Sequence, residues 1–237
     1  MSYKYGPSIV TDGLVFYVDA ANSKSYPGTG TTWTDLIDGV DGSLTNMDAT
    51  NHTSTNGGIF TFDGSNEYVD FAGLVETPSY ASISAFVRLD SGWSSTGQIA
   101  TSHSAGPPIV TDWQFRVLST REFSFNIWST GVGSNVNIVT TTTLNTGTWY
   151  HLCGTYDGTT VNLYIDGALD TTNSSGPSGT ILSSGSGNTL DLMVGARQSS
   201  APTTYFNGEI AFVQIYNRDL SATEVTQNYN ALKNRFV

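Results

Sequence analysis

Alternation of apolar and polar residues, broken at Asp-Gly pairs, constrains the fold of this chain more than any other feature of its sequence. From Gly147 to Ala168 the chain reads GTWYHLCGTYDGTTVNLYIDGA, with breaks at Asp157-Gly158 and Asp166-Gly167. An Asp-Gly pair between alternating runs predicts a type I′ hairpin turn, because both turn residues need positive φ, which Gly adopts freely and Asp tolerates. We therefore predict consecutive antiparallel strands here.

Similar alternation recurs along most of the chain, and every second side chain of a strand points to the same side of its sheet. Each expected strand therefore has one apolar face, and two antiparallel sheets laid face to face would bury these faces in an all-β sandwich. The apolar faces consist of Leu14, Phe16 and Val18; Ile83, Ala85, Val87 and Leu89; Trp113, Phe115 and Val117; Phe123, Phe125 and Ile127; Val161, Leu163 and Ile165; Leu190, Leu192 and Val194; and Ile210, Phe212 and Gln214.

The C-terminal end of the chain predicts one short helix. Ser221 followed by Glu224 forms a capping box, in which the hydroxyl accepts an amide at the helix start and the carboxylate reaches back to the cap residue. We expect this helix to pack against the edge of the sandwich. The residues at helical spacing are Val225, Tyr229, Leu232 and Phe236.

Length and composition fit one β-rich domain. The 237 residues, 38% of them hydrophobic, can bury a full core, and only 12% are charged. We predict an N-terminal arm over residues 1–11 and a single domain over residues 12–237. The Gly- and Ser-rich segment over residues 173–188 is expected to be a long surface loop, because strands on both sides are needed for one core.

Charge and hydropathy argue against nucleic acid and membranes as partners. Nine basic and twenty acidic residues give a net charge of −11, which repels nucleic acid and anionic lipid headgroups. No segment has the roughly 18 consecutive apolar residues that a membrane span requires, and the first residues do not resemble a signal peptide. The single cysteine, Cys153, lies in an apolar run and is expected to be buried.

Four blocks of sequence carry a resemblance to a known family. They are DGLVFYVDAANSKSYPGTGTTWTDL (Asp12–Leu36), FDGSNEYVDF (Phe62–Phe71), TWYHLCGTYDG with NLYIDG (Thr148–Gly167) and FNGEIAFVQIYNRDLSATEV (Phe206–Val225). They resemble laminin-G-like domains of the concanavalin A-like lectin/glucanase superfamily, in the form common in bacteriophage virion proteins. This resemblance implies a jelly roll of two curved antiparallel sheets, with adjacent first and last strands and a concave face that meets sugars in lectin relatives.

Catalytic chemistry is not indicated. Glucanases of this superfamily carry an E-x-D-x-E strand motif, whose alternate carboxylates point into one cleft, and this motif is absent. No two acidic residues lie at spacing two, so we predict no catalytic residues and no enzyme activity, although carboxylates from different strands could converge. His52, His103 and His151 are too scattered for a zinc site, and His151 is expected to be structural.

The resemblance also raises the question of calcium. Many related domains hold calcium at the rim, and the resemblance places the first ligand position near Asp112 and the second cluster over residues 196–199. Arg197 occupies that cluster where acidic character is expected, and a cation beside a cation site is unfavourable. We therefore predict no cofactor and commit to no metal, with calcium left open.

Tryptophans supply the candidate ligand-binding residues, because sugars stack their apolar faces on aromatic rings while polar side chains take the hydroxyls. Trp113 and Trp149 follow core-like alternation, and Trp33 is expected to clamp a loop. Trp128 shares a strand face with Glu122, Ser124 and Asn126, and Trp93 in the turn-rich stretch over residues 91–97 is expected to be exposed. The predicted ligand-binding residues are Trp128, Trp93, Glu122 and Asn126. A contact between subunits is the alternative interpretation of Trp128.

The resemblance and the missing acid pair together favour a non-enzymatic phage virion structural or decoration protein that contacts host-surface glycan. Its expected partners are other virion proteins and cell-surface carbohydrate. It is expected to assemble as an oligomer or in multiple copies on the virion, after synthesis in the host cytoplasm. The arm Tyr3–Pro7 is a candidate tether to the particle. A free carbohydrate-binding lectin is the first alternative, and a glycoside hydrolase or lyase with a scattered carboxylate site is the second.

Overall fold

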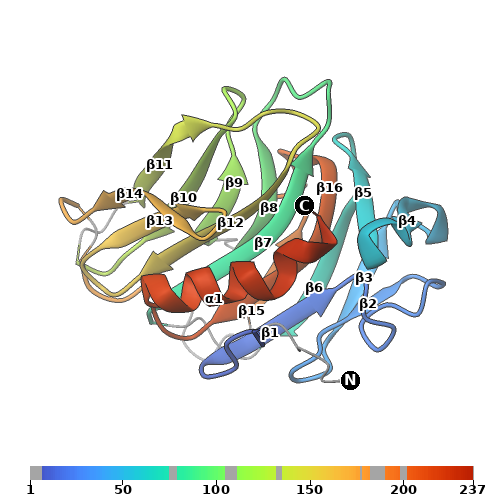
Figure 1. The fold of residues 1–237 in the computed structure, drawn as a ribbon, viewed down its shortest axis with the longest axis horizontal. Coiled ribbons are helices and arrows are strands. Elements are labelled where there is room, and N and C mark those ends of the chain that lie inside the picture. The colour runs from blue at the N-terminus through green and yellow to red at the C-terminus, as the bar shows by residue number, and fades with distance from the viewer. Residues whose placement is uncertain are drawn as a thin grey trace, which may run out of the picture.

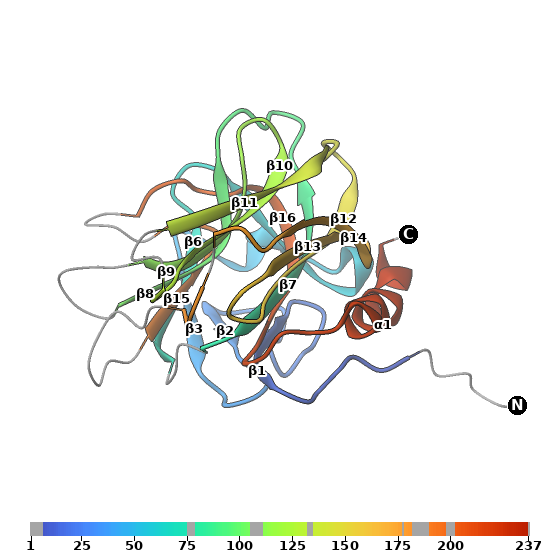
Figure 2. The same ribbon diagram turned by 90° about the vertical axis from the view of Figure 1, so that its left-hand side faces the viewer.

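The computed structural model describes residues 7–74, 79–104, 111–131, 135–176, 178–181, 190–197 and 202–236. Over these ranges the chain forms two antiparallel sheets stacked face to face, with the helix α1 lying outside one of them (Figures 1 and 2). The predicted all-β sandwich with a short C-terminal helix is confirmed.

Each sheet contains eight strands. Sheet A has the order β14-β13-β12-β7-β16-β5-β4, with β1 also paired to β16, and sheet B has the order β11-β10-β9-β8-β15-β6-β3-β2. Sheet A is built from β1 (Leu14–Asp19), β4 (His52–Thr53), β5 (Ile59–Asp63), β7 (Ala81–Leu89), β12 (Trp149–Tyr156), β13 (Val161–Ile165), β14 (Ala168–Asn173) and β16 (Asn207–Tyr216). Sheet B is built from β2 (Thr32–Thr34), β3 (Asp41–Thr45), β6 (Tyr68–Leu74), β8 (Gly97–Ser104), β9 (Thr111–Val117), β10 (Glu122–Trp128), β11 (Asn135–Thr143) and β15 (Leu190–Val194). The helices are α1 (Ala222–Leu232) and the 3₁₀ turns η1 (Ala49–Asn51), η2 (Thr55–Gly57) and η3 (Lys233–Arg235).

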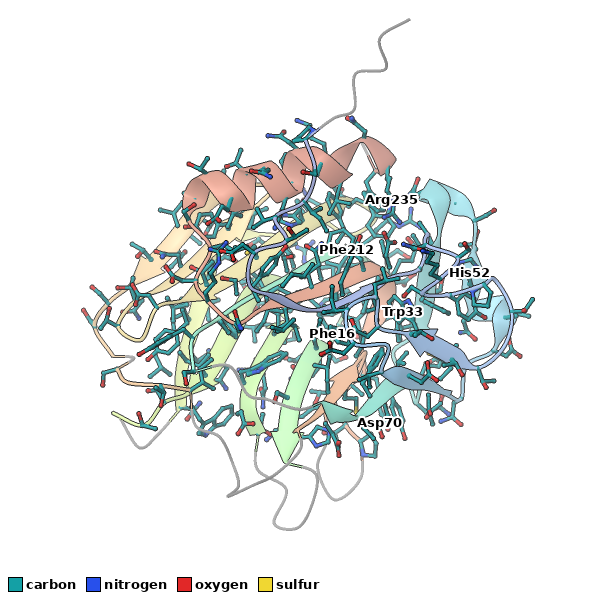
Figure 3. The ribbon with its side chains drawn as sticks, turned by 90° about the horizontal axis from the view of Figure 1, so that it is seen from below. Phe16, Trp33, His52, Asp70, Phe212 and Arg235 are labelled. Atoms are coloured by element: carbon teal, nitrogen blue, oxygen red, sulfur yellow. The ribbon has the colours of Figure 1, made fainter. Side chains whose placement is uncertain are left out.

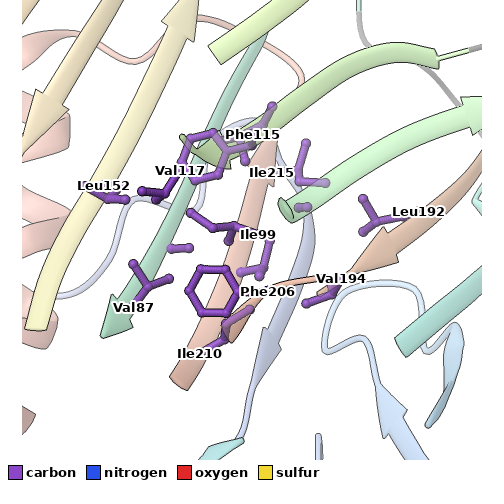
Figure 4. Packing of buried hydrophobic residues seen from close by; sticks show 14 of the residues in the cluster. Val87, Ile99, Phe115, Val117, Leu152, Leu192, Val194, Phe206, Ile210 and Ile215 are labelled. Atoms are coloured by element: carbon purple, nitrogen blue, oxygen red, sulfur yellow. The ribbon is translucent and has the colours of Figure 1, made fainter. Parts of the chain in front are cut away.

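The main core lies between the two sheets, where the alternating apolar side chains interdigitate (Figure 4). Val87 of β7 and Leu152 of β12 come from sheet A, while Phe115 of β9 and Val194 of β15 come from sheet B. All four side chains are almost completely inaccessible to solvent. Burial of this much apolar surface is the main source of stability in a sandwich without disulfides.

One predicted apolar face is split by a β-bulge. The pairing of β16 with β7 shifts between Ile210 and Phe212, so that side chains before and after the shift point to opposite sides. Ile210 belongs to the main core, whereas Phe212 packs on the outer side of sheet A, under α1. The expectation that Ile210, Phe212 and Gln214 share one face is therefore wrong, because one extra residue in a strand exchanges its two faces.

The two Asp-Gly pairs form different turns. Asp166 and Gly167 have φ of 52° and 77° and alone connect β13 to β14, which confirms the predicted two-residue turn. At Asp157-Gly158 only Gly158 has positive φ, and the connection from β12 to β13 spans residues 157–160. Asp157 Oδ1 accepts the amide of Thr160 at 2.7 Å, so this carboxylate stabilises a longer loop and the two-residue prediction is wrong there.

The C-terminal helix has the predicted capping box, since Ser221 Oγ accepts the Glu224 amide and the Glu224 carboxylate accepts the Ser221 amide. The helix covers the outer face of sheet A rather than its edge. Its buried residues Val225 and Leu232 join two small apolar clusters with side chains of β5, β7, β12, β13 and β16. The prediction of an edge position is wrong because these strands have apolar residues on both faces.

An ion pair fixes the segment after α1 to the opposite end of the chain. Arg235 Nη1 donates to Asp19 Oδ1 at 3.0 Å and to Asp19 Oδ2 at 2.9 Å, and these bonds join η3 to the end of β1. β1 itself pairs with β16, so the first and last long strands are adjacent, as the resemblance implies.

The expected N-terminal arm contacts the domain through Val10, whose backbone amide donates to Asn228 Oδ1 at 2.8 Å. In the described residues, the structure has no helix of the length and apolarity needed to cross a membrane.

Candidate functional site

The outer face of sheet B is the sheet surface that α1 does not cover, because α1 lies on the outer face of sheet A. Figure 3 shows the layers in order, with Phe212 beneath α1, Phe16 near the middle and Asp70 on the side away from the helix. We call this outer surface of sheet B the polar face. It comprises Asp70, Gln98, Thr101, His103, Asp112, Gln114, Arg116, Ser124, Asn126, Trp128, Asn135, Asn137, Asp191 and Met193.

Strand register aligns these side chains in rows across the sheet. In β10 the odd-numbered residues Phe123, Phe125 and Ile127 enter the core, so the even-numbered residues point outward. Directly paired residues of neighbouring strands then form a continuous row. The longest row runs across eight strands, through Asn137, Asn126, Gln114, Thr101, Met193, Asp70, Ser43 and Thr32.

Several polar side chains of this face are buried, although they lie outside the core. Gln98, Gln114, Ser124 and Asn126 are all at most 3% exposed. They bond to one another and to neighbours on the same face: Gln98 Nε2 donates to Gln114 Oε1 at 3.4 Å, and Ser124 Oγ donates to Asn137 Oδ1 at 2.6 Å. A surface of preordered amide and hydroxyl groups is the kind that recognises a polar ligand.

Two predicted ligand-binding residues lie together on this face and a third lies apart. Trp128 is half-buried at the end of β10, opposite Asn135 of β11, and Asn126 is two residues away on the same side. The Asn126 Oδ1 atom accepts from Asn135 Nδ2 at 3.1 Å. Glu122 is at the other end of β10, where a hydrogen bond from the Thr120 side chain lowers its pKa. Trp128 is therefore partly accessible at this end of β10, whereas Asn126 is buried and holds the exposed Asn135 in place.

The expected exposure of Trp93 is wrong. Its side chain is 8% exposed, its Nε1 donates to the Leu118 carbonyl at 2.9 Å, and its ring meets Phe206 edge-on at 5.3 Å. The turn over residues 91–97 folds the indole back onto the core, which satisfies both its apolar surface and its N–H group. Trp93 therefore offers no stacking surface for a ligand.

A group of titratable side chains at the other end of the polar face was missed by the sequence analysis. Asp191 of β15 pairs with His103 of β8 and accepts the Gly73 amide at 2.8 Å. Burial, with a smaller contribution from Asp191, raises the pKa of Asp70, while His103 acts in the opposite direction. These carboxylates come from strands far apart in sequence, so a search for acidic residues at spacing two on one strand could not find them.

Of the residues considered for calcium, Asp112, Ala196 and Arg197 lie in the described ranges. Within the described ranges, no group of three or more His, Cys, Asp or Glu side chains could hold a metal ion. Asp112 is buried in β9, and Arg197 follows β15, where its backbone pairs with Thr203. Residues 198–199 of the second predicted cluster lie outside the described residues.

The remaining singled-out residues are structural. Trp113 and Trp33 are buried in the main core. Cys153 and His151 are buried under α1, as expected for a buried cysteine and a structural histidine. Burial raises the pKa of the Cys153 thiol and lowers that of His151. Trp149 is not in the main core but packs on the helix side, 4.7 Å from the ring of Phe236, because it alternates with the core residue Leu152.

A family model for the concanavalin A-like lectin/glucanases superfamily, Laminin_G_3, matches residues 63–226. The chain belongs to this family. Among curated protein sequences, none matches the chain. The match covers most of both sheets and the start of α1, including every residue of the polar face.

Solved structures with the same fold include carbohydrate-related proteins. The chain is similar to Trypanosoma rangeli sialidase in complex with the inhibitor DANA, with a TM-score of 0.65 and 16% identity over 94% of this chain and 33% of that one. It thus spans about a third of the sialidase. It is also similar to domain 4 of the Geobacillus stearothermophilus arabinanase AbnA in complex with arabinotriose, with a TM-score of 0.65 and 16% identity over 91% of this chain and 98% of that domain. A Limulus polyphemus SAP-like pentraxin is similar with a TM-score of 0.56 and 16% identity over 71% of this chain and 79% of that chain. At these identities the likeness shows the fold alone.

Proposed function

We propose that this protein is a non-enzymatic, lectin-like domain that binds carbohydrate on the polar face of sheet B. The observation that carries the proposal is the ordered set of amide and hydroxyl side chains beside the half-buried Trp128. Sugars offer many hydroxyl groups and an apolar ring face, so amides plus one aromatic ring match their chemistry. The similarity to an arabinanase domain in complex with arabinotriose supports this choice of ligand class.

The proposed contacts divide between two kinds of side chain. The indole of Trp128 would stack on the sugar ring, and the exposed Asn135 and Asn137 amides would take hydroxyl groups along β11. Because Asn126 already bonds to Asn135, the amides are held in place before a ligand arrives, which reduces the entropy lost on binding.

Glycan-array binding of the intact chain tests the proposal. We expect specific glycans to bind, and Trp128→Ala to weaken their binding by about tenfold or more, equivalent to ~1.4 kcal/mol. Ile37→Ala is the control, since Ile37 is 42% exposed and lies between β2 and β3, at the opposite edge of sheet B from β10 and β11. Absence of binding across a broad array, or equal losses in the two variants, would refute carbohydrate recognition at this face.

We further propose that the domain works on a phage particle, as a decoration or tail protein that brings this face to host-surface glycan. The support is the resemblance of the four sequence blocks to the form common in virion proteins. Mass spectrometry of purified particles should find the chain in multiple copies. Its absence from particles together with glycan binding would favour a free lectin instead. The tether segment Tyr3–Pro7 falls outside the described residues except for its last residue.

A glycoside hydrolase is the second candidate, and the convergence of Asp70 with Asp191 is the observation that favours it. A raised carboxyl pKa suits a general acid, and retaining glycosidases use two carboxyl groups about 5 Å apart. Against it, Asp191 Oδ1 is occupied by the Gly73 amide, which suits a structural role for this carboxylate. We expect no new reducing ends when the protein is incubated with host polysaccharide, and loss of any observed turnover in Asp70→Asn would establish the hydrolase.

A further inference from the structure

Two arginines lie close together beside the polar face, in a chain that has only nine basic residues against twenty acidic ones. Arg116 of β9 is paired with Gln98 of β8. On the opposite side of β8, the backbone amide of Gln98 donates to the backbone carbonyl of Thr204. Arg197 bonds through its backbone to the adjacent Thr203. Gln98 thus lies between Arg116 on one side and, on the other, the Thr203–Thr204 segment that bonds to Arg197.

The guanidinium of Arg116 is partly buried and lies within reach of the charge of Arg197. Burial lowers the pKa of Arg116, and the positive charge of Arg197 lowers it further. Like charges placed side by side in a partly buried site destabilise a protein unless something compensates them. Such an arrangement therefore requires an explanation.

No carboxylate in the described part of the chain compensates this pair. The ion pairs found there join Arg88 to Glu209, Arg218 to Asp12 and Glu224, and Arg235 to Asp19. By contrast, Arg116 donates its Nη1 to Gln114 Oε1 at 2.6 Å and its Nη2 to Asn137 Oδ1 at 3.2 Å, both neutral acceptors.

Each arginine also retains a buried donor that could serve a ligand. The Nε atoms of Arg116 and Arg197 are buried and have no hydrogen-bond partner among the described residues. A buried donor without an acceptor costs free energy, and a charged donor costs more than a neutral one. An anionic group between the arginines would satisfy both donors and offset the repulsion.

We propose that Arg116 and Arg197 form an anion subsite of the polar face, so that the preferred ligand is an acidic saccharide with a carboxylate or sulfate group. This inference rests on the proposed carbohydrate binding and adds the class of sugar. Arg116 is paired with Ser124 of β10, two residues from Asn126 and four from Trp128, so the acidic group and the stacked ring would lie on one surface. The net charge of −11 disfavours polyanions such as nucleic acid, whereas a single acidic group can be attracted by the local pair.

Isothermal titration calorimetry of the full chain with four probes tests this subsite. The probes are an oligogalacturonate, a neutral galacto-oligosaccharide of equal length, a sulfated galacto-oligosaccharide and sodium sulfate. We expect an acidic oligosaccharide to bind at least about tenfold more tightly than the neutral one, and the advantage to shrink as salt is added. The relative affinities of the uronate and sulfated probes distinguish the two sources of negative charge.

Variants separate the subsite from general charge effects. Arg197→Gln should remove most of the preference for acidic ligands while leaving the fold intact, because the Arg197 side chain makes no hydrogen bond among the described residues. Arg116→Lys retains the charge but loses the forked donor geometry, and should lower affinity for the acidic probe by a smaller factor. Lys24→Gln is the control, since it removes one positive charge from an exposed loop and should leave binding unchanged.

The outcomes distinguish this inference from the proposed function. Equal affinity for acidic and neutral oligosaccharides, with binding still lost in Trp128→Ala, would overturn the anion subsite and leave carbohydrate binding intact. Sulfate binding that depends on Arg197, without affinity for any oligosaccharide, would support the subsite and refute carbohydrate binding. Binding of the acidic probe that Arg197→Gln and Arg116→Lys leave unchanged would also overturn the inference.

Discussion

Acidification should destabilise this protein through His151, a histidine with no solvent exposure beneath α1. Its ring lies 5.5 Å from the ring of Phe86 and 5.9 Å from that of Tyr229, and neither ring nitrogen has a hydrogen-bond partner among the described residues. Burial lowers its pKa from 6.5 to about 3. Because the folded state binds the proton more weakly than the unfolded state, the neutral ring's contribution is complete above pH 6.5 and is lost as pH falls toward 3.

The size of the effect follows from the difference in pKa. Each pH unit below 6.5 favours the protonated, unfolded state by about 1.4 kcal/mol until the folded pKa is reached. At pH 4.5, two units below the unfolded value, His151 should lower the free energy of unfolding by about 3 kcal/mol relative to neutral pH. This is a large part of the stability of a typical domain.

Urea unfolding of the wild type and of His151→Leu at pH 7.5 and pH 4.5 measures this term. Leucine has no titratable group and leaves no unsatisfied nitrogen, so the variant should be at least as stable at pH 7.5 and lose about 3 kcal/mol less on acidification. The nearby Asp166, whose carboxylate accepts the His151 amide at 2.9 Å, titrates in both proteins and largely cancels in the comparison. An equal loss of stability in the two proteins, or an NMR titration of the His151 ring near pH 6.5, would refute the reasoning.

Three further substitutions test structural contacts, with the free energy of unfolding as the measurement. Arg235→Gln breaks the ion pair in which Arg235 Nη1 donates to both carboxylate oxygens of Asp19. It should cost about 2 kcal/mol, less than a fully buried pair because the arginine is partly exposed, and an effect below about 0.5 kcal/mol would contradict that role. Gly42→Ala should cost about 1–3 kcal/mol, because its Cβ would lie 2.4 Å from ring carbons of Phe71, and a neutral effect would show that the ring moves freely. Ser221→Ala removes the N-cap of α1 and should cost about 1 kcal/mol, whereas Ser221→Asp should retain most of the stability.

Part of the candidate site could be predicted from local alternation. The alternation in β10 correctly placed Trp128 and Asn126 on the outward face, because strand periodicity decides which side chains share a face. It could not predict the burial of Trp93, which depends on contacts with Leu118 and Phe206 from other parts of the chain. Nor could it place Asp191 beside His103, because the pairing of β15 with β8 joins distant segments.

The same limit applies to the fold. The capping box of α1 and the turn at Asp166-Gly167 follow from a few neighbouring residues, and both formed as predicted. The sequence did not predict the bulge after Ile210 or the position of α1 across sheet A. Each depends on which apolar surface of another strand remains to be covered.

By itself, the sequence determined the sandwich class, the apolar faces of most strands and the start of the C-terminal helix, because these depend on periodicity and on hydrogen bonds within a few residues. Only the tertiary structure decided which polar side chains meet on the outer face of sheet B. Arg116 and Arg197 are brought together by strand register and sheet order, and these are set by burial of the whole core rather than by residues next to either arginine.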